Sequence, residues 1–181
     1  MATTQVAARP DFAAELSERT GTPVTRCYQC GKCSAGCPMA EEMDLLPHQV
    51  MQSVLVGRRD RVLTANTPWL CASCLVCSAR CPMDIDIAAV MDGLRQISFR
   101  EGRPGEKQVA TFHDRFLKIV GLLGRAYEPG MVLATPLSLR ERIKQLPLGV
   151  LLFLKGRMPI LPHRIKNRSS VRQLFKESGL K

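Results

Sequence analysis

The 181-residue sequence lacks an export signal and any apolar run long enough to cross a bilayer. Residues 1–12 contain no apolar core of signal-peptide length. The longest apolar stretch, residues 146–154, contains Pro147 and Gly149 and falls far short of the ~20 residues that a membrane span needs. We therefore expect a cytoplasmic protein without a transmembrane segment. In a reducing compartment, free cysteines serve as metal ligands more often than they form disulfides.

Motifs for bond-making chemistry are also missing. The sequence contains no phosphate-binding Gly-rich loop, no nucleophile elbow and no HExxH. Its three histidines, His48, His113 and His163, are scattered, and a lone histidine is more often structural or solvated than a ligand. Aromatic residues make up only 5%, which argues against a nucleic-acid-binding protein despite a formal net charge of +10. We expect no catalytic site in this chain and no nucleic-acid partner.

Eight cysteines are present, and all of them lie between residues 27 and 81. They form two blocks with the spacing C-x2-C-x2-C-x3-C-P-M, separated by a constant offset of 44 residues. The first block comprises Cys27, Cys30, Cys33 and Cys37, and the second comprises Cys71, Cys74, Cys77 and Cys81. The identical spacing, with the same trailing Pro-Met, indicates two copies of one cofactor-binding unit.

This spacing is typical of bacterial ferredoxins, in which each 4Fe–4S cluster takes its fourth cysteine from the other motif. Applied here, one cluster is held by Cys27, Cys30, Cys33 and Cys81, and the other by Cys71, Cys74, Cys77 and Cys37. Structural zinc normally uses two C-x2-C pairs per ion and would leave cysteines surplus. Disulfides would need an oxidising compartment, and inert buried cysteines would not recur in register. Two 4Fe–4S clusters are the predicted cofactors.

Apolar residues around the blocks follow the period of helices, without the alternation typical of strands. We expect a helix that starts at Pro47 and ends at Gly57, a short helix over residues 58–64 and a turn at residues 66–68. After the second block, Asp84 or Asp86 is the expected N-cap of an amphipathic helix. The apolar face of that helix consists of Ile87, Val90, Met91, Leu94 and Ile97.

The C-terminal part of the sequence combines one further helix with an irregular segment. A helix over residues 106–123 is expected to bury a stripe of apolar side chains. These are Val109, Phe112, Phe116, Leu117, Val120 and Leu123. Five prolines beyond residue 128 predict an irregular chain that packs on the first domain and on something else.

The doubled motif with its helical spacer resembles the α-helical ferredoxin domain, and more closely the family of heterodisulfide reductase C subunits. The resemblance covers about residues 24–130. It rests on RCYQCGKC at 26–33, GCP at 36–38, WLC at 69–71, Asp84-Ile85, Leu94-Arg95, Phe116, Gly124-Arg125 and Glu128. It implies an all-α fold: an N-terminal arm over residues 1–22, the dicluster domain over residues 23–102, and a basic, helical or irregular extension over residues 103–181 that docks on other subunits.

By the same resemblance, the chain is the electron-relay subunit of an oxidoreductase complex. Electrons from an A subunit that bears flavin and iron–sulfur clusters would cross its two clusters to a B subunit with CCG domains, which reduces a disulfide or a related sulfur compound. Flavins of this family often bifurcate electrons. Other relatives carry a 2Fe–2S domain ahead of the cysteines or CCG domains after them. This sequence shows neither, so we expect its electron donor and acceptor on other polypeptides.

Charge is distributed unevenly, with −2 over residues 1–94 and +12 over residues 95–181. The basic half is either a solvated surface or a docking surface for acidic partner subunits. The candidate docking residues are Arg157, Arg164, Lys166, Arg168 and Arg172, with Leu161, Val171 and Leu174 as apolar anchors. Two other functions stay open. One is a mobile ferredoxin, although such carriers tend to be small and acidic. The other is the relay subunit of a membrane-associated respiratory oxidoreductase that docks through residues 146–154.

Overall fold

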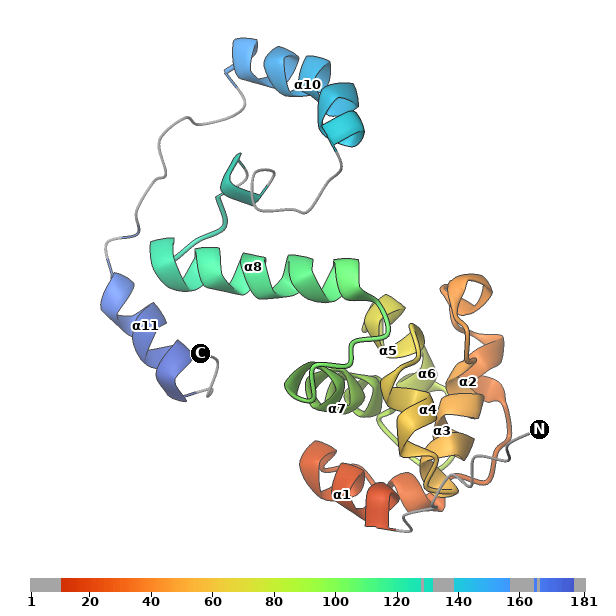
Figure 1. The fold of residues 1–181 in the computed structure, drawn as a ribbon. Helices are drawn as coiled ribbons and strands as arrows, with labels where there is room; N and C mark the ends of the chain where they lie inside the picture. Colours follow the sequence, from red (N-terminus) through yellow and green to blue (C-terminus); the bar gives the residue numbers. More distant parts are fainter. Residues whose placement is uncertain (1–10, 128, 132–138, 157–164, 166, 178–181) are drawn as a thin grey trace, which may run out of the picture. The chain divides into compact units, whose positions relative to one another are not determined.

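The computed structural model describes residues 11–127, 129–131, 139–156, 165 and 167–177, and this part of the chain is helical without any strand (Figure 1). The all-α prediction is confirmed. The chain divides into two compact units, Met1–Lys107 and Gln108–Lys181. Several residues that the sequence singled out lie outside the described ranges: Glu128, Arg157, Leu161, His163, Arg164 and Lys166, as do residues 1–10 of the expected arm.

Helix α7 (Ile87–Arg100) is the centre of the first unit and contacts several of its neighbours. These neighbours are α1 (Asp11–Thr20), α4 (Arg59–Leu63), α5 (Thr67–Leu70) and α6 (Val76–Ala79). The predicted apolar face of α7 is buried throughout, so the periodicity identified it correctly. Asp86 is the N-cap, because its carboxylate accepts the Ala89 N–H at 3.0 Å. Asp84 instead adopts a left-handed conformation with φ of 52°.

The segment between the cysteine blocks forms a short 3-10 helix, Ala40–Glu42, and then three α-helices. As predicted, α3 (Pro47–Leu55) begins at Pro47, and the chain leaves it through Gly57 with φ of 70°, a conformation that glycine adopts without strain. Helix α4 was also predicted. The expected turn at residues 66–68 was wrong, because α5 begins there. A proline in the first turn of a helix loses no hydrogen bond, so Pro68 does not prevent it.

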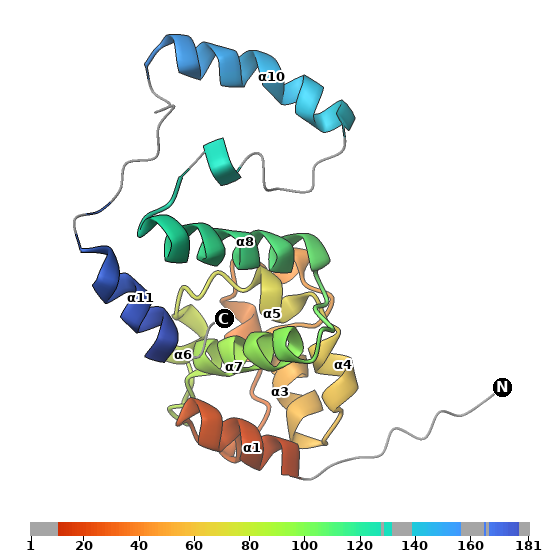
Figure 2. The ribbon, with the colours of Figure 1, turned by 60° about the vertical axis from the view of Figure 1, so that its left-hand side comes forward.

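Helix α1 lies beside α7 in both ribbon views (Figure 1, Figure 2), and the two helices are in contact. Phe12 and Leu16 are fully buried in the core of this unit, although they lie in the expected N-terminal arm, for which no helix was predicted. Gly93 allows the close approach of the two helices. A Cβ atom added there would lie 2.8 Å from Thr20 Cγ2, which is closer than real Cβ contacts.

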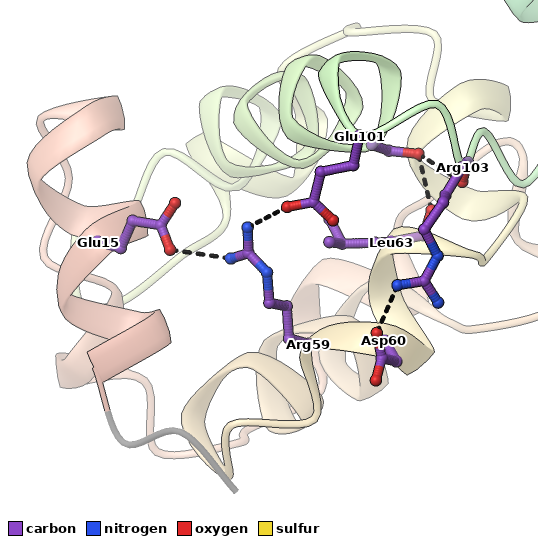
Figure 3. Close-up of polar contacts among 7 residues, drawn as sticks. Glu15, Arg59, Asp60, Leu63, Glu101 and Arg103 are labelled. Atoms are coloured by element: carbon purple, nitrogen blue, oxygen red, sulfur yellow. Dashed lines mark hydrogen bonds and ion pairs between the residues drawn. The ribbon is translucent and has the colours of Figure 1, made fainter. Parts of the chain in front are cut away.

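Arg59 joins three parts of the first unit (Figure 3). Its guanidinium lies 2.9 Å from Glu15 of α1, pairs with Glu101 at the end of α7 and covers the Phe12 ring at 4.8 Å. Arg103 pairs with Asp60 of α4 at 2.6 Å. These contacts fix α1 and α4 against the C-terminal end of α7.

The second unit contains α8 (Lys107–Leu123, all but its first residue), α10 (Leu139–Leu154) and α11 (Arg168–Glu177). Helices α10 and α11 lie in the stretch that was predicted to be irregular, and Pro147 sits inside α10. The buried stripe predicted for α8 was wrong, since Phe112 and Phe116 are 43% and 37% exposed. Periodicity shows which residues share a face but not whether another element covers it. None of the described helices is long and apolar enough to cross a membrane.

Candidate iron–sulfur centres

Two pockets of the first unit each gather four cysteines. The first pocket, of about 350 Å³ including space open to solvent, is lined by Cys27, Cys30, Cys33 and Cys81. The second, of about 390 Å³, is lined by Cys37, Cys71, Cys74 and Cys77. Each pocket therefore combines three cysteines of one block with the last cysteine of the other block. This grouping is the same as the ligand sets expected from the sequence.

The loops that carry the cysteines repeat the same unusual backbone. Gln29 and Ser73, which are 44 residues apart, both have positive φ, as do Gly31 and Leu75. Three of these four residues are not glycine, and each left-handed non-glycine residue costs on the order of 1–3 kcal/mol. Such conformations persist only where the surroundings impose them. Their recurrence in register indicates that both loops are shaped to wrap around a bound group.

Each loop leads into a one-turn helix that is anchored to a longer helix. Lys32–Ala35 forms α2 and Val76–Ala79 forms α6, and the two contact each other. Ser34, directly after the third cysteine of its block, accepts the His48 N–H at 3.0 Å and lies 2.7 Å from His48 Nδ1. Ser78, at the matching position, accepts the Ala88 N–H at 3.3 Å and donates to Asp86 at 2.7 Å. The N-termini of α3 and α7 thus hold the two motifs in equivalent ways.

His48 lines the first pocket and therefore belongs to the site, although sequence reasoning missed it. No local signal could have identified it, since its partner Ser34 lies 14 residues away in the sequence. Met83 lines the same pocket, and Met39 at the matching position lines the second. Each pocket thus has an apolar wall, to which the buried Ile87 contributes in the first pocket and Met43 in the second.

The cysteines within one pocket differ in exposure, and in both pockets the second cysteine of a block is the exposed one. Cys33 is buried and Cys77 is half-buried, and burial raises the pKa of both thiols. Cys30 and Cys74 are exposed. An iron–sulfur centre would stabilise the thiolate forms of Cys33 and Cys77. The exposed pair leaves one edge of each site at the surface, where an electron can be exchanged.

These features fit two iron–sulfur clusters. Eight free cysteines stand in two sets of four, around hollows that the loops enclose. Four thiolates are the ligand set of a 4Fe–4S cluster, with one cysteine on each iron. Within the described residues, no three Cys, His, Asp or Glu side chains stand close enough together to hold a single metal ion.

Comparison with protein families matches residues 26–86 to the 4Fe-4S dicluster domain. This part of the chain is a 4Fe–4S dicluster domain. It binds two 4Fe–4S clusters, and the predicted cofactors are confirmed.

Several curated proteins are similar to about half of this chain. The iron–sulfur C 2 subunit of the CoB–CoM heterodisulfide reductase of Methanocaldococcus jannaschii is 34% identical over 103 residues, which are 56% of this chain and 55% of the relative. The C subunit of the H(2):CoB-CoM heterodisulfide,ferredoxin reductase of Methanothermobacter marburgensis is 28% identical over 104 residues, 56% of each chain. The C subunit of the Ferredoxin:CoB-CoM heterodisulfide reductase of Methanosarcina acetivorans is 39% identical over 82 residues, 45% of this chain and 33% of the relative. The chain spans about half the length of the first two relatives and a third of the last.

The chain is thus a relative of the C subunits of heterodisulfide reductases, as the sequence motifs indicated. These relatives are subunits of an oxidoreductase, and some are named as its iron–sulfur subunit.

Proposed function

We propose that this chain is the electron-relay subunit of a heterodisulfide reductase-type complex and has no catalytic site of its own. One cluster is held by Cys27, Cys30, Cys33 and Cys81, and the other by Cys71, Cys74, Cys77 and Cys37. The observation that carries the proposal is the composition of the two pockets, each of which gathers four thiols from both cysteine blocks. The names of the relatives support the type of complex.

Each bound cluster supplies a site that gains and loses one electron. The chain holds the clusters through eight thiolates, and the contact between α2 and α6 keeps the two motifs adjacent. Exposed Cys30 and Cys74 open one edge of each site to the surface. An electron can therefore enter at one edge and leave at the other, while the buried faces of α3 and α7 exclude water.

The donor in this proposal is a flavin-bearing A subunit, and the acceptor is a B subunit with CCG domains that reduces a disulfide or a related sulfur compound. The complex is cytoplasmic, and α11 contributes to its assembly. Arg172 and Leu174 of this helix are exposed, which suits docking on an acidic partner face with an apolar contact.

Anoxic purification of the tagged full chain from its native source, with identification of the co-eluting proteins, tests this proposal. We expect a flavoprotein and a protein with CCG domains, and we expect their recovery with an Arg172→Glu variant to fall. The matched control is Arg100→Glu, which reverses another exposed charge. Recovery of the chain without these two proteins would refute the proposed complex.

A second candidate, an iron–sulfur relay of a membrane-associated respiratory oxidoreductase, is favoured by the surface of α10. This helix exposes a stripe of apolar side chains: Ile143, Leu146, Val150, Leu151 and Leu154. Exposed Arg140, Lys144 and Lys155 accompany the stripe, and apolar faces with basic flanks bind anionic bilayer surfaces. Flotation with vesicles of phosphatidylcholine and phosphatidylglycerol distinguishes the candidates. Binding that Leu146→Glu abolishes supports the second, and absence of binding removes it.

A further inference from the structure

The two cysteine motifs are anchored in equivalent ways, but they differ in one charge. Ser34 of the first motif contacts the imidazole of His48 at 2.7 Å. Ser78 of the second motif donates to the carboxylate of Asp86, also at 2.7 Å. The two serines follow Cys33 and Cys77, which line different pockets. The serine of the second motif therefore contacts a carboxylate, whereas the serine of the first motif contacts an imidazole that itself lines the first pocket.

Asp86 carries a full negative charge at neutral pH. The hydrogen bond from the Ser78 hydroxyl, together with the Ala89 N–H, holds the pKa of this carboxyl below its ordinary value. An imidazole has no negative charge in either of its protonation states. The local electrostatic potential is therefore more negative at Ser78 than at Ser34.

The helix termini increase this difference. The N-terminus of a helix carries a partial positive charge, and both α3 and α7 direct theirs at the serine of one motif. At α7 the Asp86 carboxylate offsets that positive charge. Helix α3 has no acidic residue in its first turn, so its positive end acts on the first motif without compensation.

Other nearby charges do not cancel the effect. On the side of the second pocket, Arg95 donates to the Cys71 carbonyl, but it also lies 3.6 Å from Asp92, and the pair is close to neutral. Around the first pocket, Arg26 and Lys32 are exposed together with Asp84, which leaves an excess of one positive charge. Arg80 packs against Gly36 beside Cys37 and directly precedes Cys81, so its charge lies next to one cysteine of each set. Like the difference between His48 and Asp86, the excess around the first pocket makes the electrostatic potential more positive at the first pocket than at the second.

We propose that Asp86 holds the reduction potential of the second cluster below that of the first, so that a single electron entering the chain resides on the cluster of Cys27, Cys30, Cys33 and Cys81. Reduction adds one negative charge to a cluster, and a nearby carboxylate opposes that addition. Asp86 acts through Ser78 and is a positioning residue rather than a ligand. This inference rests on the ligand sets proposed above.

A redox titration of the cluster-loaded full chain, followed by EPR, tests the inference through the Asp86→Asn variant. Asn caps a helix about as well as Asp, so the fold should be retained. We expect the lower of the two midpoint potentials to rise. The ratio between the two singly reduced forms should change about tenfold, which is ~59 mV for a one-electron centre. The higher potential should move less. Glu18→Gln, the same chemical change on an exposed part of α1, is the matched control.

If Asp86→Asn fails to load with iron, Asp86→Ser serves instead, because serine also caps helices and has no charge. A shift confined to the higher potential would place the electron on the other cluster and overturn the inference. So would equal shifts of both potentials, or a shift no larger than that of Glu18→Gln. Failure of the ligand sets themselves would be detected separately, by the iron content of the cysteine variants described below.

Discussion

Each proposed cluster takes one cysteine from the other motif. Double variants can distinguish this arrangement from one in which each block holds its own cluster. If Cys81 completes the site of Cys27, Cys30 and Cys33, then Cys30→Ser and Cys81→Ser damage the same cluster. If each block holds its own cluster, Cys81→Ser and Cys74→Ser damage the same one. The pockets group Cys81 with Cys30 and not with Cys74.

The expected magnitudes follow from the number of irons. The intact chain should bind about eight irons, four in each cubane. The Cys30→Ser/Cys81→Ser variant removes two thiolates from one pocket and none from the other, so about four irons should remain. The Cys74→Ser/Cys81→Ser variant removes one thiolate from each pocket, and both clusters should be lost or converted to forms with fewer irons.

The assay is chemical analysis of iron and acid-labile sulfide on anoxically prepared protein, with EPR of the reduced state. A reciprocal pair, Cys74→Ser/Cys37→Ser and Cys30→Ser/Cys37→Ser, should behave in the mirror-image way. The ligand sets would be refuted if Cys74→Ser/Cys81→Ser kept one intact cluster while Cys30→Ser/Cys81→Ser lost both. Circular dichroism of the α-helical signal checks that each variant is folded.

Three further outcomes are expected. Gly93→Ala should lower the free energy of unfolding by about 1–3 kcal/mol in urea titrations, because its Cβ collides with α1. The control Gly149→Ala, whose Cβ meets no atom within 4 Å, should not lower it. Equal effects of the two variants would contradict the packing of α1 on α7. Arg59→Met should destabilise the protein by about 1 kcal/mol, and Arg100→Met, at an exposed position, should have no measurable effect. The free energies of unfolding from the same urea titrations test both expectations. Removal of the clusters with a chelator and an oxidant should raise hydrogen exchange in residues 27–37 and 71–81, because the left-handed loop residues need the bound group to hold them. The centre of α7 should stay protected. Uniform loss of protection would show that the helical core also depends on the clusters.

The sequence predicted those features that local spacing controls. The apolar period of residues 87–97 identified the buried face of α7, and Asp86 was one of two candidates for its N-cap. The cysteine spacing suggested sets of four that the pockets also bring together. In each case a short stretch of sequence determines which atoms can lie close together, because helix geometry or loop length fixes their separation.

Features that depend on tertiary contact were not predicted. Phe12 and Leu16 become core residues only because α7 offers a surface with Gly93 in it. His48 becomes part of the first site only because α3 packs with its N-terminus toward Ser34. The opposite error occurred in α8, where an apolar stripe was expected to be buried although Phe112 and Phe116 are exposed. Amphipathic sequence specifies a face, while its burial depends on a partner that the same sequence segment does not contain.

A duplicated motif supplies two equal binding sites, and equal sites give an electron no preferred position. Ligands, loop conformation and the serine after the third cysteine are all repeated, so none of them can make the two clusters different. The difference must come from residues outside the repeat. Helix α3 begins with Leu46, Pro47 and His48 where α7 begins with Asp86, Ile87 and Ala88, and of these six residues only Asp86 is an anion. In the proposed relay, the second layer of residues therefore sets which cluster holds the electron, and it can change while all eight cysteines remain fixed.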